Sequence, residues 1–217
     1  PGTGHIYAHR MEPPGNIANN VRTVYEDSNG DFWVGTQVTG LYRHDGKTGE
    51  WTRYRNNPDD PRSLSFNSVR SIVEDRKGRF WISTSGGGLN LMDRKTGTFT
   101  RYFHDPEDPS SLSSNFCRIM FEDSTGKLWV CTNGGGLDCF DPDTGRFTHF
   151  RNDPDDPTSI SNDYVFSIFE DRQGILWVGT FGGGLCRFDP GTGTFTTYTV
   201  ADGLPNNVVY GILEDKD

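Results

Sequence analysis

The stretch Ile168-Phe-Glu-Asp-Arg-Gln-Gly-Ile-Leu-Trp-Val-Gly-Thr180, followed by Gly182-Gly-Gly-Leu185, occurs in related form four times in this chain. Each of its key residues returns after 48 positions. The recurring sets are Trp33, Trp81, Trp129 and Trp177, the pairs that begin at Glu26, Glu74, Glu122 and Glu170, and Leu41, Leu89, Leu137 and Leu185. A fixed period of about 20–50 residues is typical of solenoids, propellers and arrays. The chain is therefore a repeat protein.

Each repeat contains four short runs that are typical of β-strands. In the second repeat these runs are Val69–Val73, Phe80–Thr84, Leu89–Asp93 and Phe99–Tyr102. They are rich in β-branched and aromatic residues and are bounded by turn residues, with no sustained helical period. Four antiparallel strands in about 48 residues make one propeller blade. The sequence predicts an all-β fold, a β-propeller with four complete four-stranded blades.

The ends of the chain add pieces of one more blade. Pro1-Gly-Thr-Gly4 matches Pro190-Gly-Thr-Gly193, so His5 to Arg10 is expected to be a fourth strand, and Val209 to Asp215 a first strand. We expect one propeller segment over residues 1–217, with blades at about 21–66, 67–114, 115–162 and 163–207 and a partial blade split between 1–20 and 208–217. We expect such a segment to belong to a longer propeller or to be completed by a partner chain, and a closed four-bladed ring with two spare strands is the alternative. Incomplete edges would also allow self-association.

Composition narrows the classes of partner. The 21 basic and 30 acidic residues give a net charge of −9, a field that repels phosphate backbones and argues against nucleic acid. No apolar run approaches the roughly 18–20 residues that span a bilayer, and no leading signal segment is visible. The 27 glycines and 12 prolines in 217 residues fit a fold built from short strands and tight turns.

Residues that are the same in every repeat are expected to serve the scaffold. The repeated tryptophan is predicted to pack between neighbouring blades, because a unique binding site would not need it four times. Five polar residues just before the first strands are predicted to have turn or cap roles: Asn19, Asn67, Asn115, Asp163 and Asn207. The four cysteines, Cys117, Cys131, Cys139 and Cys186, do not follow the period and are expected to be packed thiols. We expect no metal and no cofactor.

Residues that vary between repeats at the mouth of the channel are candidates for binding. In a propeller the first strand lines the channel, and four residues before the repeated Glu stand Arg22, Arg70, Arg118, Phe166 and Tyr210. Forked guanidinium donors and aromatic faces would suit an acidic or polyhydroxy ligand. Pairing of these arginines with nearby carboxylates is the alternative. The loop between the second and third strands adds Gln37, Ser85, Asn133 and Phe181, which differ while their flanks do not.

The quoted motif, Glu-Asp-x-x-Gly-x-x-Trp-[Val/Ile]-[Gly/Ser/Cys]-Thr, resembles the two-component regulator propeller repeat. The resemblance covers all four repeats, although Gln37-Val-Thr-Gly40 replaces the glycine cluster in the first. It implies a sensor propeller on the periplasmic side of the inner membrane, joined in family members to histidine kinases or other output domains. Many such propellers are thought to sense glycan fragments.

The leading hypothesis from the sequence is the ligand-binding sensor segment of a bacterial two-component-type receptor, located in the periplasm. Its expected ligand is an oligosaccharide or another small polar molecule. Three alternatives remain open: a propeller lyase, a protein-interaction scaffold and a quinoprotein, the last suggested by Asp45-Gly-Lys-Thr-Gly-Glu-Trp51. Catalysis is not expected, because the five histidines show no clustered histidine–carboxylate arrangement that faces the channel.

Overall fold

The computed structural model describes residues 20–215 as four separate antiparallel sheets of four strands each. In every sheet the strands follow chain order, as expected for propeller blades, so the predicted all-β fold with four complete blades is confirmed. The strands are β1 (Val21–Glu26), β2 (Phe32–Thr36), β3 (Leu41–His44), β4 (Trp51–Tyr54), β5 (Val69–Glu74), β6 (Phe80–Thr84), β7 (Leu89–Asp93), β8 (Thr98–Tyr102), β9 (Cys117–Glu122), β10 (Leu128–Thr132), β11 (Leu137–Asp141), β12 (Arg146–Phe150), β13 (Val165–Glu170), β14 (Leu176–Thr180), β15 (Leu185–Asp189) and β16 (Thr194–Tyr198).

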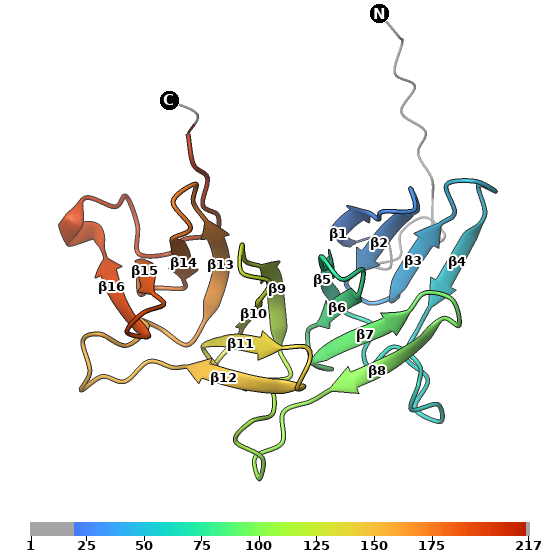
Figure 1. Ribbon diagram of the computed structural model, residues 1–217, viewed down its shortest axis with the longest axis horizontal. Helices are drawn as coiled ribbons and strands as arrows, with labels where there is room; N and C mark the ends of the chain where they lie inside the picture. The colour runs from blue at the N-terminus through green and yellow to red at the C-terminus, as the bar shows by residue number, and fades with distance from the viewer. Residues whose placement is uncertain (1–19, 216–217) are drawn as a thin grey trace, which may run out of the picture.

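The four blades follow one another around an open arc (Figure 1). The first strands β1, β5, β9 and β13 lie on the inner side of the arc, and the fourth strands β4, β8, β12 and β16 lie on the outer side. Neighbouring inner strands contact one another. No helix within residues 20–215 has the length and apolar character to cross a bilayer.

The core consists of three clusters, each formed between two successive blades. In each cluster a tryptophan of one blade packs against an aromatic ring of the next. The ring centroids of Trp33 and Phe80 are 4.7 Å apart, and those of Trp81 and Phe140 are 5.3 Å apart. Trp33 and Trp81 are fully buried. The prediction that the repeated tryptophan packs between blades is confirmed for Trp33, Trp81 and Trp129, whereas Trp177 contacts Tyr198 of its own blade.

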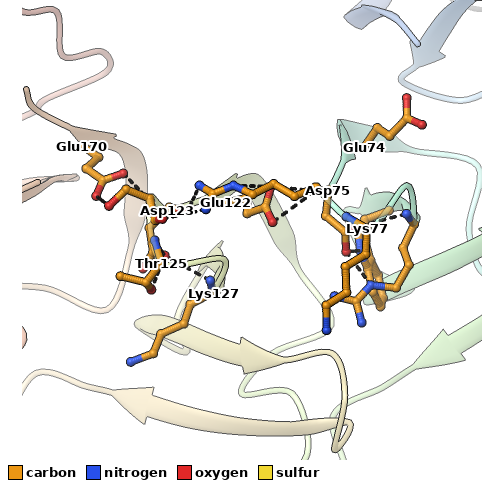
Figure 2. Close-up of polar contacts among 12 residues, drawn as sticks. Glu74, Asp75, Lys77, Glu122, Asp123, Thr125, Lys127 and Glu170 are labelled. Atoms are coloured by element: carbon orange, nitrogen blue, oxygen red, sulfur yellow. Dashed lines mark hydrogen bonds and ion pairs between the residues drawn. The ribbon is translucent and has the colours of Figure 1, made fainter. Parts of the chain in front are cut away.

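The repeated Glu makes a second link between blades, at the turn that follows each inner strand. Glu122 accepts a hydrogen bond of 3.1 Å from the backbone nitrogen of Arg76, and Glu170 accepts one of 2.6 Å from the backbone nitrogen of Ser124. Figure 2 shows Glu122 beside the turn of Asp75 and Glu170 beside the turn of Asp123. Each Glu therefore caps the turn of the blade before its own, which the sequence analysis did not foresee.

Small residues in the second strands let the next inner strand approach closely. A Cβ added at Gly35 in β2 would lie 2.6 Å from a methyl group of Val69 in β5. A Cβ added at Gly179 in β14 would lie 2.7 Å from a methyl group of Val209. A larger side chain would push the blades apart, which explains Gly, Ser or Cys at this position of the motif.

The prediction of a first strand at Val209 to Asp215 is wrong. After β16 and a short 3₁₀ helix, η2 (Val200–Asp202), the segment 209–215 contains no strand, and only Val208 makes a bridge, with Phe181. A β-strand needs a hydrogen-bonded neighbour, and the described residues contain no second strand after Val209. The segment still repeats the contacts between blades, because Glu214 accepts a hydrogen bond from the backbone of Arg172. The expected strand His5 to Arg10 lies outside the described residues.

Candidate ligand site at the inner rim

A β-bulge interrupts the start of every inner strand. The pairing of β1 with β2 shifts between Val21 and Thr23, which leaves Arg22 as the extra residue. Equivalent shifts leave Arg70 unpaired in β5 and Phe166 unpaired in β13, and Arg118 lies in the corresponding shift of β9. Bulges re-aim side chains and are frequent next to functional sites. These four predicted rim residues therefore each lie at the bulge, which is the one irregular position of an otherwise regular inner strand.

The three arginines converge on one small cavity. A space of about 190 Å³ is lined by Arg22, Arg70, Arg118 and Ile119. Within residues 20–215, none of these three guanidinium groups forms an ion pair or a hydrogen bond. Among the described residues, the alternative from the sequence, pairing with nearby carboxylates, is therefore not found for these three arginines.

The electrostatics of the cavity reflect this lack of counter-charge. Burial lowers the pKa of Arg70, and the neighbouring charges of Arg118 and Arg22 lower it further. Burial also lowers the pKa of Arg118, assisted by the charge of Arg22 and opposed by Cys131 and Tyr210. Like charges held close together in a partly desolvated place destabilise one another. The cavity is accordingly a concentration of positive potential.

An aromatic cluster continues the cavity toward the last blade. The guanidinium carbon of Arg118 lies 3.7 Å from the ring centroid of Phe166, a close cation–π contact. The ring of Phe166 lies 5.1 Å from that of Phe181 and 5.4 Å from that of Tyr210. We call Arg22, Arg70, Arg118, Phe166, Phe181 and Tyr210 the inner rim. Phe181 and Tyr210 are 47% and 68% exposed, so their faces are available to a ligand.

The remaining predicted site residues lie in the loops between second and third strands. The Oδ1 of Asn133 is buried without a hydrogen-bond partner. Gln37 accepts a hydrogen bond of 2.7 Å from the side chain of Asn20, and Ser85 forms a bridge with Phe116. No hydrogen bond or ion pair given for residues 20–215 joins Gln37, Ser85 or Asn133 to the three arginines. The structure thus assembles six of the nine predicted residues into one rim and leaves these three outside it.

Three exposed aromatic residues next to the inner strands were missed by the sequence analysis. Phe66, Phe116 and Tyr164 are 45%, 54% and 50% exposed and lie in the connections that enter β5, β9 and β13. The ring of Phe66 lies against Gly86 and Gly87. The signal in the sequence was a large aromatic residue one to three positions before each of these inner strands.

The polar residues before the inner strands hold the loops around the rim. Oδ1 of Asn115 accepts a hydrogen bond of 2.8 Å from the backbone nitrogen of His104, and its carbonyl oxygen accepts bonds from Gly86 and Gly88. Asn67, Asp163 and Asn207 make the same kinds of contact in their own repeats. The predicted turn and cap role is confirmed for these four, whereas Asn19 lies outside the described residues.

Basic side chains at the opposite end of the blades differ from the arginines of the inner rim in having carboxylate partners. There a cavity of about 550 Å³ opens between the second and third blades, lined among others by Arg76, Lys77 and Arg79. Arg79 binds Asp75 and Asp143, Lys77 binds Asp143, and Arg76 lies 3.8 Å from Glu122. These three cations therefore have carboxylate partners, whereas the three arginines of the inner rim have none among residues 20–215.

The described histidines lie apart from the inner rim, whereas Cys131 is close enough to Arg118 to influence its pKa. His44 ends β3, His104 follows β8 and His149 lies in β12, while His5 and His9 fall outside the described residues. All four cysteines are free thiols, and burial raises the pKa of Cys131 well above its ordinary value and that of Cys139 to about 11. These groups do not approach the arginine cavity as a nucleophile with a base.

A family model described as the two component regulator propeller matches residues 15–38, 63–86, 111–134 and 159–182. Each matched stretch includes an inner strand and the second strand of its blade, and together the four stretches contain every residue of the inner rim except Tyr210. The chain carries two component regulator propeller repeats. No curated protein matches the sequence significantly.

Two solved structures with 28% identity resemble this chain. They are the extracellular domains assigned to the hybrid two component systems BT3049 and BT4673 of B. thetaiotaomicron, with TM-scores of 0.70 and 0.68. The matches cover 87% and 85% of this chain and 25% of each of those chains. The chain therefore spans about a quarter of the length of these relatives.

Propeller enzymes share the fold of these repeats. A streptogramin B lyase matches with a TM-score of 0.66 and 21% identity, over 91% of this chain and 59% of its own. A virginiamycin B lyase from Staphylococcus aureus matches with a TM-score of 0.66 and 19% identity, over 92% of this chain and 61% of its own. At this level of identity the likeness extends to the architecture alone.

Proposed function

We propose that this chain is part of the ligand-binding sensor of a bacterial two-component-type receptor. In this proposal residues 1–217 are one propeller segment with blades at about 21–66, 67–114, 115–162 and 163–207, located in the periplasm. The ligand is a glycan fragment or another small polar molecule bound at the inner rim. Support for the receptor comes from the repeats and from the two extracellular domains that the chain resembles.

The observation that carries the binding site is the set of three arginines without counter-charge beside exposed aromatic rings. Guanidinium groups donate hydrogen bonds in a fixed fork, and aromatic faces stack on sugar rings. A folded protein rarely leaves such groups unpaired, because burying them without partners costs free energy. A ligand that accepts hydrogen bonds would restore these partners.

Binding also fits the inner rim better than catalysis does. Turnover requires a nucleophile or an acid–base pair in a defined place. The described histidines lie on, or shortly after, third and fourth strands of the blades. The residues of the inner rim are arginines and aromatic residues. We therefore propose recognition without turnover as the role of this segment.

Titration calorimetry of this chain with a panel of neutral and acidic oligosaccharides tests the proposal. At least one member is expected to bind, and Arg70→Gln and Arg118→Gln are expected to weaken that binding about tenfold or more. Arg62→Gln is the matched control, because Arg62 is an exposed arginine in the connection between β4 and β5, beside the outer strand β8.

Two results would overturn the proposal. One is the absence of binding across the whole panel while the chain is folded. The other is binding accompanied by cleavage of the oligosaccharide, which would make the chain an enzyme of the lyase or hydrolase class.

A further inference from the structure

The inner rim carries three arginines without a carboxylate partner among residues 20–215, an arrangement that the scaffold does not require. The chain has 30 acidic and 21 basic residues, so carboxylates are abundant. Outside the rim, the arginines Arg43, Arg79 and Arg94 each lie within hydrogen-bond distance of a carboxylate. Arg22, Arg70 and Arg118 face one cavity that no carboxylate of residues 20–215 lines. A purely structural cluster would be expected to include a carboxylate, because mutual repulsion of partly buried cations such as Arg70 and Arg118 destabilises the fold.

One of the two buried side-chain polar atoms without a partner belongs to an arginine that lines the cavity. Among residues 20–215 these atoms are Nε of Arg118 and Oδ1 of Asn133, and both belong to residues predicted for the site. Buried polar groups in folded proteins are nearly always hydrogen-bonded, so an orphan calls for an explanation. The unpartnered donor of Arg118 is consistent with a ligand that supplies an acceptor at the cavity.

The size and walls of the cavity indicate what part of a ligand it takes. Its volume of about 190 Å³ is smaller than the roughly 300–1,000 Å³ of a pocket for a complete small molecule. It has room for one head group, while the rest of the ligand lies over exposed surface. Phe181 and Tyr210 supply that surface next to Phe166.

Phe166 acts as a positioning residue in this arrangement. Its ring lies 3.7 Å from the guanidinium carbon of Arg118, so one face is already occupied by the protein itself. The contact holds Arg118 in a fixed orientation toward the cavity and reduces the entropy that the side chain would lose when it binds. The stacking surface left for a ligand is then formed by Phe181 and Tyr210.

From these observations we infer that the ligand of the inner rim is an acidic sugar, whose carboxylate or sulfate group enters the cavity of Arg22, Arg70 and Arg118 while its ring lies against Tyr210 and Phe181. The inference rests on the proposed function and makes it specific. Binding brings the missing counter-charge, so affinity depends on the acidic group and falls as ionic strength rises.

The test compares disaccharides that differ by a single acidic group, each neutral sugar against its uronic acid or its sulfate ester. Calorimetry at low ionic strength is expected to show the acidic member binding at least about tenfold more tightly, with a smaller difference in high salt. Arg70→Gln and Arg118→Gln are expected to abolish the difference. Arg70→Lys keeps the positive charge but loses the forked donors of the guanidinium group, so it is expected to retain part of the difference in affinity. Arg62→Gln is expected to retain the whole difference.

The melting temperature separates a binding effect from unfolding. Replacing one of several mutually repelling cations is expected to leave the melting temperature of Arg70→Gln unchanged or raised. Neutral members that bind as tightly as their acidic partners would overturn the acidic-sugar inference and leave the proposed function intact. A folded chain that binds neither kind of sugar would overturn both.

Discussion

The indole Nε1 of Trp81 donates a hydrogen bond of 2.9 Å to Oδ2 of Asp75, and the same bond occurs in each of the other three blades. Oδ1 of Asp75 also accepts bonds from the backbone nitrogens of Lys77 and Arg79. One buried carboxylate thus joins the core tryptophan to the turn after the inner strand. This explains why Glu-Asp and Trp recur together in the sequence.

Replacing this carboxylate is expected to destabilise the protein strongly. Asp75→Ala leaves the buried indole N–H of Trp81 and the turn amides without their acceptor, and each unsatisfied group costs about 1–3 kcal/mol. We expect the free energy of unfolding to fall by at least about 2 kcal/mol, as measured by urea denaturation. Asp59→Ala is the control, because Asp59 is exposed in a connection between blades. Equal stability of the two variants would contradict this role.

The repeated carboxylates also predict how stability depends on acid. Burial tends to raise the pKa of Asp27, Asp75 and Asp123, but the hydrogen bonds that they accept outweigh it and lower the pKa below the ordinary value of 3.8. A depressed pKa contributes stability that is present above the unfolded value and is lost as the pH falls toward the folded one. We therefore expect little loss from these groups between pH 7 and about 5, and a steep loss below about 4.

Urea denaturation over a series of pH values measures this dependence. The midpoint of the transition in Asp75→Asn is expected to change less with acid than that of the unaltered chain, because one of the titrating groups is gone. An identical acid dependence in the two proteins would show that the repeated aspartates are not responsible.

Near neutral pH, His149 makes stability depend on pH in the opposite direction to the repeated aspartates. Its Nδ1 lies 2.7 Å from Oδ1 of the buried Asp138, and its Nε2 lies 3.0 Å from the carbonyl oxygen of Pro109. Both neighbours are acceptors, so only the protonated ring can donate to both. The bond to Asp138 raises the pKa of His149 above 6.5, although burial and the charge of Arg151 oppose the shift.

A raised pKa stabilises the fold below the unfolded value of 6.5, and this stability is lost as the pH rises through the folded pKa. We expect the unaltered chain to lose stability between pH 6 and 9, whereas His149→Gln should show a flatter profile over the same range. NMR titration of the ring provides a direct reading of the pKa. A value below 6.5 in the folded protein would contradict the proposed bonding.

Two glycines with similar φ angles allow the cost of backbone strain to be separated from the cost of a steric collision. Gly30 has φ of +81° with open space around it, whereas Gly88 has φ of +69° and a Cβ there would collide with the carbonyl oxygen of Tyr102. Gly30→Ala is expected to cost about 1–2 kcal/mol from the left-handed backbone alone. Gly88→Ala adds the collision and is expected to cost clearly more, as measured by thermal unfolding. A similar loss in both variants would mean that the loop yields to the added methyl group.

The sequence by itself was enough to predict the four blades, the packing of Trp33, Trp81 and Trp129 between them and the alignment of Arg22, Arg70 and Arg118. These features follow from local patterns, namely strand length, turn residues and a constant period, which an observer can read along the chain. The same regularity misled at Val209, where a strand-like pattern lacks a neighbouring strand with which to pair.

Only the tertiary structure decided what surrounds the arginines. Arg22, Arg70 and Arg118 are 48 residues apart, and whether a carboxylate lies beside them depends on how three blades meet and on a bulge that no sequence pattern announces. The cap that Glu122 places on the turn of Arg76 is hidden for the same reason. Contacts between blades join residues that are distant in the chain, so the period shows that they are equivalent but not which atoms they touch.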